Sequence, residues 1–437
     1  MRSLWHRAAA WLVGASGLGA GLAMAGPADN FTRVVEHEDG LRTTLEMAVR
    51  AYRPVTGSGP TIFLAAAVHI ADQSFYGELQ TLLDGLDVVL YEGVQPPGQP
   101  RDPRWETPRD DTFLASVTQA RAHLLGVYLA DFNREHGRFP ATLDELVQGI
   151  PEDQQPLLAP ALFDAWGRNF VISTVEPEPP SRRRRGDAPA PTGPIAYVVS
   201  LGADGALGGE GVNADLFASP QFPREAFTTD ARSEGLQQRL ADALQLHFQL
   251  TSMNHDRLNW RNSDVGVDQI QQSLVALGAE NQGEVLFDAL GGQGLTGQLA
   301  KVLVGFVGRS DSMRESTKVM LVDVLARAEE LLPAQENMLG PLMSVILDER
   351  NKVVLEDLRL VLQNEPDTRS IGIIYGAGHL SGIEKSLTED LGYEAVGERW
   401  VPAITADLAK AGMNARQAKR IREMFKRQID AQLRRGR

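Results

Sequence analysis

The fold is predicted first from the stretch IGIIYGAGH, residues 371–379, which joins a short apolar run to a histidine. Its first five residues are typical of a strand that is covered on both faces of a parallel sheet. The small residues that follow allow close backbone approach and leave room for the His379 imidazole to project towards a ligand. TIFLAAAVH, residues 61–69, has the same arrangement and ends at His69. The two stretches predict two buried strands, each followed by a histidine.

The region after His69 predicts an α/β unit. Residues 75–86 have apolar side chains at helical spacing, and residues 87–91 form a second apolar run that ends at Glu92. Ligand sites in open α/β sheets favour the edge where parallel strands have their carboxyl ends. We therefore expect His69 and Glu92 to lie at this edge.

The character of the chain changes after a segment rich in Pro, Arg and Asp at 95–110, which is typical of a linker. The patterns then predict a helix, two strands, a glycine-rich loop and a second linker, in that order: 111–137, 169–174, 195–200, 201–215 and 220–223. Residues 233–345 are expected to be largely helical before the α/β pattern returns at Ser370. A small α+β domain is thus expected to interrupt a larger α/β domain.

Length and charge limit the class of protein. A chain of 437 residues is long enough for two cores, and a formal charge of −14 argues against general affinity for nucleic acid. There is no cysteine, so thiolate metal sites, cysteine nucleophiles and disulfides are excluded. Residues 1–25 combine early basic residues, an apolar run and a final Ala-Met-Ala, as in a signal peptide. An exported, periplasmic or extracytoplasmic protein is expected, with an N-terminal membrane anchor as the alternative.

The two histidines and Glu92 have the chemistry of a metal site. Neutral imidazole suits Zn, Mn, Fe or Co, and a nearby carboxylate can complete the ligand set. A site with an open coordination position makes a bound water nucleophilic at neutral pH. Spacing alone leaves the alternative open, in which each histidine only hydrogen-bonds to the backbone.

Four stretches resemble the TraB/Tiki family: AAVHIAD at 66–72, LYE at 90–92, ERN at 349–351 and YGAGHLSG at 375–382. The resemblance covers residues 31–110 and 225–405, and the segment 254–264 around Trp260 and Asp264 is similar to the family's central segment. The family has a pair of Gly-x-x-His motifs with a glutamate between them, although Ala66 stands here where glycine is typical. Tiki members are metal-dependent proteases, and bacterial TraB-type members include regulators that reduce peptide-pheromone signalling.

This resemblance implies roles for individual residues. His69, Glu92 and His379 become the ligand and catalytic set for a divalent metal, which could be Mn, Co or Zn. Arg350 becomes a stabiliser of a substrate carboxylate or an oxyanion, with a structural ion pair to Glu349 or Asp348 as the alternative. A carboxylate that orients His69 is also expected, and Asp72 and Glu78 are the nearest candidates.

The segment SLGADGALGGEGVNADL, residues 200–216, contains five glycines and three acidic residues. Glycines permit tight turns that aim oxygen atoms at one centre, and hard oxygen ligands suit Ca²⁺. The spacing is not that of an EF-hand, and the acidic residues disfavour a bound phosphate. Composition alone leaves open an acidic surface loop without metal.

Residues 113–217 resemble the C-terminal domain of the major pseudopilin of type II secretion. The matching stretches are YLADF at 128–132 through GRFP at 137–140, LDEL at 143–146, DAWGRNF at 164–170 and the loop at 200–216. The resemblance implies a stabilising calcium bound by Asp204, Asp215, the carbonyl of Leu201 and Asn213. The pseudopilin's long apolar N-terminal helix is missing and a run of arginines at 182–185 enlarges one loop, so a docking or structural module is expected rather than a filament subunit.

Together these observations predict a TraB/Tiki-like α/β domain with a large helical region, interrupted by a small α+β pseudopilin-like domain. The expected segments are a signal peptide at 1–25, the two halves of the larger domain at 26–111 and 220–405, the calcium-loop domain at 112–219, and a basic amphipathic helix at 406–437. This last helix is expected to dock on the body of the protein, or alternatively to bind an acidic partner or lipid surface. The expected function is that of an exported metal-dependent hydrolase, peptidase-like, acting on a peptide or protein. The alternative is a non-catalytic binding protein associated with the envelope or with a type II secretion system.

Overall fold

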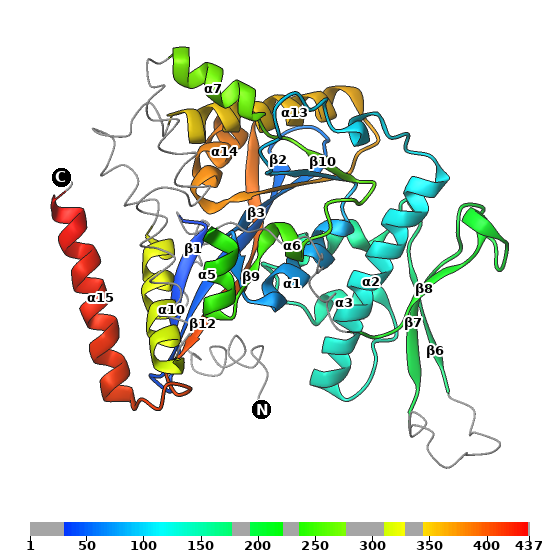
Figure 1. Cartoon of the computed structure of the whole chain (residues 1–437). Coiled ribbons are helices and arrows are strands. Elements are labelled where there is room, and N and C mark those ends of the chain that lie inside the picture. The colour runs from blue at the N-terminus through cyan, green and yellow to red at the C-terminus, as the bar shows by residue number, and fades with distance from the viewer. Residues whose placement is uncertain (1–29, 177–192, 222–235, 277–309, 328–343, 436–437) are drawn as a thin grey trace, which may run out of the picture.

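The computed structural model describes residues 30–176, 193–221, 236–276, 310–327 and 344–435. A mixed sheet with surrounding helices forms the larger domain, and a smaller α+β domain projects from one side of it (Figure 1). The structure is therefore of the mixed α/β class. The predicted signal peptide at 1–25 and the arginine run at 182–185 lie outside the described residues.

Four parallel strands form the part of the sheet that carries the candidate site. In spatial order they are β3 (Thr61–Ala67), β11 (Ser370–Gly376), β5 (Val88–Tyr91) and β10 (Trp260–Asn262). β11 lies between β3 and β5 and is buried along nearly its whole length, as its apolar sequence predicts. The three strands that precede His69, Glu92 and His379 are consequently neighbours, and their carboxyl ends meet at one edge.

Antiparallel strands extend the sheet on the β3 side. They are β1 (Thr32–Glu36), β2 (Arg42–Pro54) and β12 (Tyr393–Asp407). β2 pairs with β3, β1 and β12, so it lies at the centre of this half. The long strand β12 was not predicted. The basic C-terminal helix was expected from residue 406, but α15 begins only at Ala415, because β12 continues to Asp407.

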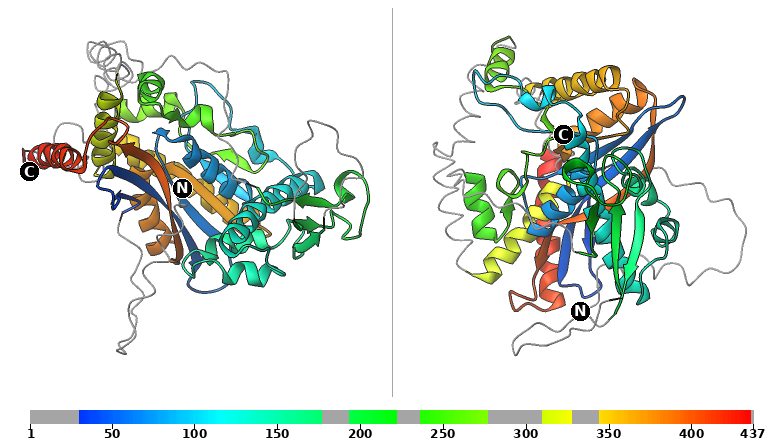
Figure 2. Two further views of the ribbon diagram at one scale, coloured as in Figure 1. Left: turned by 90° about the horizontal axis from the view of Figure 1, so that it is seen from below. Right: turned by 90° about the vertical axis from the view of Figure 1, so that its right-hand side faces the viewer.

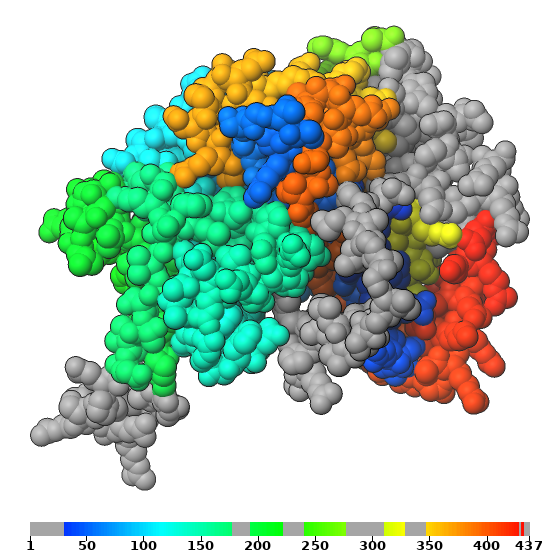
Figure 3. All heavy atoms as spheres, turned by 180° about the vertical axis from the view of Figure 1, so that it is seen from behind, coloured from blue at the N-terminus to red at the C-terminus, as the bar shows by residue number. Residues whose placement is uncertain are grey.

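Asn414 and Gln417 explain the start of α15 (Ala415–Arg435). The Asn414 side chain accepts the Gln417 amide at 3.1 Å, and the Gln417 side chain accepts the Asn414 amide at 3.0 Å. This reciprocal arrangement is a capping box, which satisfies two amides that have no partner inside the helix. Figures 1 and 3 place α15 at the end of the molecule opposite the small domain. It packs on α10 (Asp311–Ala326), where Phe425 and the buried Ala418 contribute to a small apolar cluster.

The other helices of the larger domain surround the sheet (Figure 2). They are α1 (Gln73–Asp84), α5 (Leu236–Leu244), α6 (Gln249–Ser252), α7 (Val267–Ala276), α13 (Arg350–Asn364) and α14 (Ala377–Glu389), with a π-helical turn at Ser344–Glu349. A short two-stranded sheet joins β4 (Ile70–Ala71) to β9 (His247–Phe248). None of the helices within the described ranges is long and apolar enough to cross a membrane.

The small domain has the predicted order of a long helix followed by strands. α2 (Asp111–His136) is capped by the Asp110 side chain and ends at Gly137, whose φ of 70° suits glycine. A three-stranded antiparallel sheet follows, made of β6 (Val171–Val175), β7 (Ile195–Ser200) and the unpredicted β8 (Leu216–Ala218). Short helical segments lie between α2 and the sheet: Leu143–Gln148, Gln155–Leu158 and Ala159–Leu162.

Buried polar contacts attach this small domain firmly to the larger one. Arg121 of α2 is fully buried and donates to Asp87 at 2.9 Å and to the carbonyl of Gly85 at 2.8 Å. Asp87 in turn accepts the backbone amides of Arg369 and Ser370, at the start of β11. The joint therefore connects α2 directly to two of the parallel strands.

The segment 95–110 differs from the predicted linker. It contains a short 3₁₀ helix, Pro103–Glu106, whose cap Asp102 is buried and accepts the amide of Asn262 at 2.8 Å. The Trp105 indole also donates to the Asn262 carbonyl at 2.9 Å. Proline and charged residues favoured a solvated linker, but these polar contacts fasten the segment beside β10. The second half of the other predicted linker, at 220–223, lies outside the described residues.

Candidate active site

Glu92 and His379 come together where two adjacent strands end. Glu92 follows β5, and its amide donates to the carbonyl of Ile374 in β11 at 3.1 Å. His379 lies in the first turn of α14, directly after β11. Its Nε2 atom is 3.8 Å from Glu92 Oε1, and both side chains are nearly buried. The sequence places these residues far apart, so it is the position of β11 beside β5 that makes them neighbours.

Arg350 lies between two carboxylates in this site. Its Nη2 is 2.6 Å from Glu92 Oε1 and 2.6 Å from Asp264 Oδ2, and its Nε is 2.9 Å from Asp264 Oδ1. The second Glu92 oxygen accepts the Gly376 amide at 2.6 Å. Both oxygens of Glu92 are thus held, which fixes the carboxylate at the end of the strands.

The surroundings of Glu92 keep it ionised. Burial opposes its negative charge, but Arg350, the two histidines and the Gly376 amide outweigh this and hold the pKa of Glu92 below its usual range. Burial also opposes the positive charge of Arg350, while Asp264 and Glu92 raise its pKa. Arg350, Glu92 and Asp264 together carry a net charge of minus one, which favours the approach of a cation.

His379 is held as a neutral imidazole with a defined tautomer. Burial lowers its pKa to about 4, so it carries no charge at neutral pH. Its Nδ1 lies 2.8 Å from Asn351 Oδ1, and the Asn351 amide nitrogen donates to the His379 carbonyl at 3.3 Å. This second bond orients the Asn351 side chain with its oxygen towards the ring, which assigns the ring proton to Nδ1. The Nε2 lone pair therefore faces Glu92 and Arg350, with Arg350 Nη1 at 3.4 Å.

His69 lies at the end of β3, and its side chain is exposed. It contributes to the low pKa of both Glu92 and His379, which shows that it belongs to the same electrostatic neighbourhood. Ala66, which replaces the family's usual glycine, lies in regular strand geometry opposite Tyr375. Within the described residues Gln245 alone has a positive φ without being glycine, so alanine is accommodated at this position.

The contacts of three charged side chains differ from the expected ones. The role of Arg350 as a stabiliser of a substrate carboxylate or an oxyanion stays a prediction, but its alternative, an ion pair with Glu349 or Asp348 on an exposed turn, is wrong. Arg350 is buried and pairs with Glu92 and Asp264. Glu78 pairs with Arg399 and Asp72 accepts the Thr405 amide, so both of these side chains are engaged elsewhere.

Three groups of the site had no predicted role: Asp264, Asn351 and the Gly376 amide. Asp264 and Asn351 both occur in the stretches that carry the family resemblance, and Asn351 directly follows Arg350. For Asn351, the signal in the sequence was its position directly after Arg350, because a polar side chain next to an arginine can belong to the same site. The backbone amide could not be foreseen, because its position depends on the β5–β11 register.

The donors of the site fit a divalent cation in their chemistry. His379 Nε2 has its lone pair directed towards Glu92, and its other ring nitrogen is fixed by Asn351, as is usual for a ligating histidine. His69 is the residue that would complete the set. In the part of the chain that the structure describes, no three His, Asp or Glu side chains are already grouped in ligand geometry. Arg350, at 2.6 Å from Glu92, is the competing partner of the carboxylate.

The glycine–aspartate loop is folded tightly upon itself. All five of its glycines have positive φ, as their spacing predicts: Gly202, Gly205, Gly208, Gly209 and Gly211. Asp215 Oδ2 accepts the Gly208 amide at 3.0 Å, whereas Asp215 Oδ1 is buried and has no hydrogen-bond partner. Asp204 Oδ1 accepts the Ala206 amide at 2.9 Å. A buried carboxylate oxygen without a donor is what a calcium ligand would be before the ion binds.

The remaining two predicted ligands lie in the same loop. Leu201 follows β7, and the exposed Asn213 ends the 3₁₀ turn Gly211–Asn213. The Arg168 side chain donates to the carbonyls of Gly202 and Ala203 in the loop. Its positive charge neutralises part of the acidic loop.

The described core thus belongs to the class of mixed α/β proteins with a polar site at the carboxyl edge of parallel strands. Comparison of the chain with protein-family models, with curated proteins and with solved structures finds no match. The roles implied by the resemblances to the TraB/Tiki family and to the major pseudopilin are therefore proposals.

Proposed function

We propose that this protein is an exported, metal-dependent hydrolase of the TraB/Tiki type, peptidase-like in its action. The observation that carries the proposal is the state of His379. This imidazole is neutral, its proton is fixed on Nδ1 by Asn351, and its Nε2 lone pair faces the ionised Glu92. A buried histidine with one nitrogen fixed and the other unprotonated beside a carboxylate is prepared to bind a cation.

The proposed roles follow from the positions of the side chains. His379 and Glu92 would hold the ion, which could be Mn, Co or Zn, and His69 would complete the ligand set. A bound divalent ion supplies a nucleophilic water at neutral pH and polarises a carbonyl group. Arg350 fixes the Glu92 carboxylate, and its guanidinium is the cation of the site that would stabilise a substrate carboxylate or an oxyanion. Asn351 holds the His379 imidazole in place, and Asp264 holds the Arg350 guanidinium.

We also propose that the small domain binds calcium through Asp204, Asp215, Asn213 and the Leu201 carbonyl. The support is the unpartnered Asp215 Oδ1 in a loop whose glycines make its tight turns. Bound calcium would stabilise this domain, which is attached beside the strands that carry Glu92 and His379. A positioning or docking role for a secretion or envelope partner fits this location.

A second function is favoured by one specific observation. Arg350 already neutralises Glu92 at 2.6 Å, as in an ion pair that serves the fold rather than a reaction. The second candidate is therefore a non-catalytic binding protein of the envelope or of type II secretion, in which the histidines have no ligand.

Peptidase activity separates the two functions. The full chain is assayed against an unstructured peptide library with added Mn²⁺, Co²⁺ or Zn²⁺, beside the variants His379→Ala and His136→Ala. His136 is exposed on α2 and serves as the matched control. We expect metal-stimulated cleavage in the wild type and in His136→Ala, and its loss in His379→Ala. Equal cleavage in all three proteins, or none with any metal, would contradict the hydrolase proposal.

A further inference from the structure

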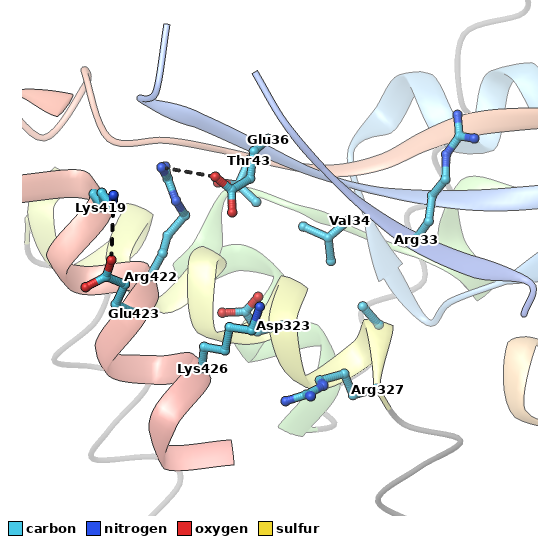
Figure 4. A pocket seen from close by; sticks show the side chains of 11 residues that line it. Arg33, Val34, Glu36, Thr43, Asp323, Arg327, Lys419, Arg422, Glu423 and Lys426 are labelled. Atoms are coloured by element: carbon cyan, nitrogen blue, oxygen red, sulfur yellow. Dashed lines mark ion pairs between the residues drawn. The ribbon is translucent and has the colours of Figure 1, made fainter. Parts of the chain in front are cut away.

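A cavity lies apart from the Glu92–His379 site, between the sheet and the C-terminal helix. Its volume is about 620 Å³, within the range of small-ligand sites. It is lined by β1 and β2 on one side and by α10 and α15 on the other (Figure 4). The lining is mainly charged and shares no residue with the candidate active site: Arg33, Glu36, Asp323, Arg327, Lys419, Arg422, Glu423 and Lys426, with Val34, Thr43 and Ala326.

Most of these charges have partners. Glu36 pairs with Arg422 at 3.4 Å, and Lys419 pairs with Glu423 at 3.9 Å, as drawn in Figure 4. Two further cations of the lining pair with acids that lie outside it, Arg33 with Glu46 at 2.6 Å and Arg327 with Asp430 at 2.5 Å. Within the part of the chain that the structure describes, one acid and one base of the lining remain without an ion-pair partner.

Asp323 and Lys426 are that acid and base. Asp323 Oδ2 is buried and has no hydrogen-bond partner, and burial raises the pKa of this carboxyl above its usual value. Lys426 is exposed on the facing helix α15, and among the described residues it forms no ion pair. In Figure 4 the Lys426 side chain extends from α15 towards Asp323 on the neighbouring helix α10, and no hydrogen bond or ion pair joins these two described side chains. Of the lining residues that the structure describes, Asp323 is therefore the acid without an ion-pair partner, and Lys426 is the base without one.

We propose that this cavity binds a small zwitterion that carries an ammonium group and a carboxylate. The ammonium donates to the Asp323 carboxylate, and the ligand's carboxylate accepts from Lys426. Such a ligand satisfies both groups at once and brings no net charge into the cavity. Val34 and Ala326 supply the apolar wall for the carbon atoms between its two charged ends.

A simple anion fits this cavity less well. It would satisfy Lys426 but would leave Asp323 without a donor, beside the nearby negative charge of Glu36. A simple cation would satisfy Asp323 but would meet five Lys and Arg side chains in the lining. Free amino acids and short peptides share the required pair of end groups.

Calorimetric titration of the full chain tests the proposal with glycine, glycylglycine and two capped forms of glycylglycine. N-acetylation removes the ammonium group, and C-terminal amidation removes the carboxylate. We expect at least one uncapped probe to bind, and each cap to weaken its binding about tenfold or more. Tighter binding of glycine than of glycylglycine would identify a free amino acid as the ligand, and the reverse would identify a peptide.

Variants assign the binding to this cavity. Asp323→Asn keeps the shape of the side chain and should weaken the uncapped probe about tenfold or more without lowering the melting temperature. Lys426→Gln should have the same effect on binding. Asp390→Asn and Lys385→Gln, both exposed on or beside α14, are the matched controls and should bind as the wild type does. The proposal is overturned if no probe binds at millimolar concentration, if capped and uncapped forms bind equally, or if Asp323→Asn binds unchanged.

Discussion

Burial determines the protonation state of two histidines in and near the candidate site. Two histidines, His379 and His255, have pKa values lowered from 6.5 to about 4, in both cases mainly by burial. His255 lies against the rings of Tyr91 and Trp260, away from solvent. Both side chains are therefore neutral at neutral pH. Neither property is visible in the sequence, because burial of a histidine depends on the surrounding tertiary contacts.

The low pKa of His379 predicts a specific loss of stability in acid. Between about pH 6.5 and 4 the unfolded chain binds the proton and the folded chain does not, so the free energy of unfolding falls as the pH falls. Each of the two histidines should contribute a loss of about 2 kcal/mol between pH 6.5 and 5. Urea unfolding at several pH values measures this slope. It should decrease in His379→Gln and decrease again when His255→Gln is added; an unchanged slope in both variants would contradict the assignment.

Asn351 provides a second prediction at this scale. Asn351→Leu removes the acceptor of the His379 Nδ1 proton at similar side-chain volume. Nitrogen NMR of the imidazole should then show mixed tautomers, and metal-stimulated cleavage should fall about 10- to 100-fold. Asn351→Asp keeps an acceptor and should retain the Nδ1 tautomer while raising the pKa of His379. A single Nδ1–H tautomer in Asn351→Leu would show that Asn351 does not position the ring.

Individual elements were predictable where their sequence pattern is local. β3, β5, β7, β11, α1 and α2 were expected within a few residues of their bounds, since apolar runs and helical spacing identify them. The short strands β8, β9 and β10 were missed, because two or three residues are too few for a period to show. β12 was missed although it has 15 residues. The first half of β12 is mostly half-buried and mixes polar with apolar residues, so it has no clear alternation. Two irregularities of register also interrupt its pairing with β2.

The glycine–aspartate loop predicts a response to calcium. Calcium should raise the melting temperature of the full chain, with a stabilisation of about 2.7 kcal/mol when free calcium exceeds its Kd about 100-fold. Asp215→Asn should remove most of this response, since it changes the buried oxygen that has no partner. Asp204→Ala should do the same. Asp144→Ala, an exposed acid in the same domain, is the control. Equal melting of the wild type in calcium and in chelator would contradict the calcium site.

The whole molecule depends on the joint between its two domains. The sequence indicated an insertion near residue 112, but it did not indicate that α2 would bury an arginine against the strand that leads to Glu92. Likewise the sequence placed three strands before three site residues, but not β11 between β3 and β5. Both features depend on contacts between residues that are distant in the chain, which local patterns do not contain.

Arg121→Met tests that joint. The variant leaves Asp87 buried with one cation fewer, so the free energy of unfolding should fall by about 3 kcal/mol. A larger loss is not expected, because Arg109 at 3.3 Å and two backbone amides still contact Asp87. Arg134→Met on the exposed face of the same helix should cost less than about 1 kcal/mol.

Urea unfolding followed separately at Trp166, in the small domain, and at Trp260, in the larger one, checks this prediction. The two transitions should coincide in the wild type, because the buried joint couples the domains. A stability of Arg121→Met equal to that of the wild type would show that the joint contributes little.

The position of β11 also determines the order in which the chain can fold during synthesis. β3 and β5 are made early, but the strand that lies between them is residues 370–376 of a chain of 437. The small domain, in contrast, finds all its strand partners within residues 171–218 and can fold while the ribosome is still working. Between the synthesis of residue 218 and that of residue 370, the folded insert is therefore attached to strands β3 and β5 that each lack their partner β11, and such unpaired edges are prone to wrong pairing.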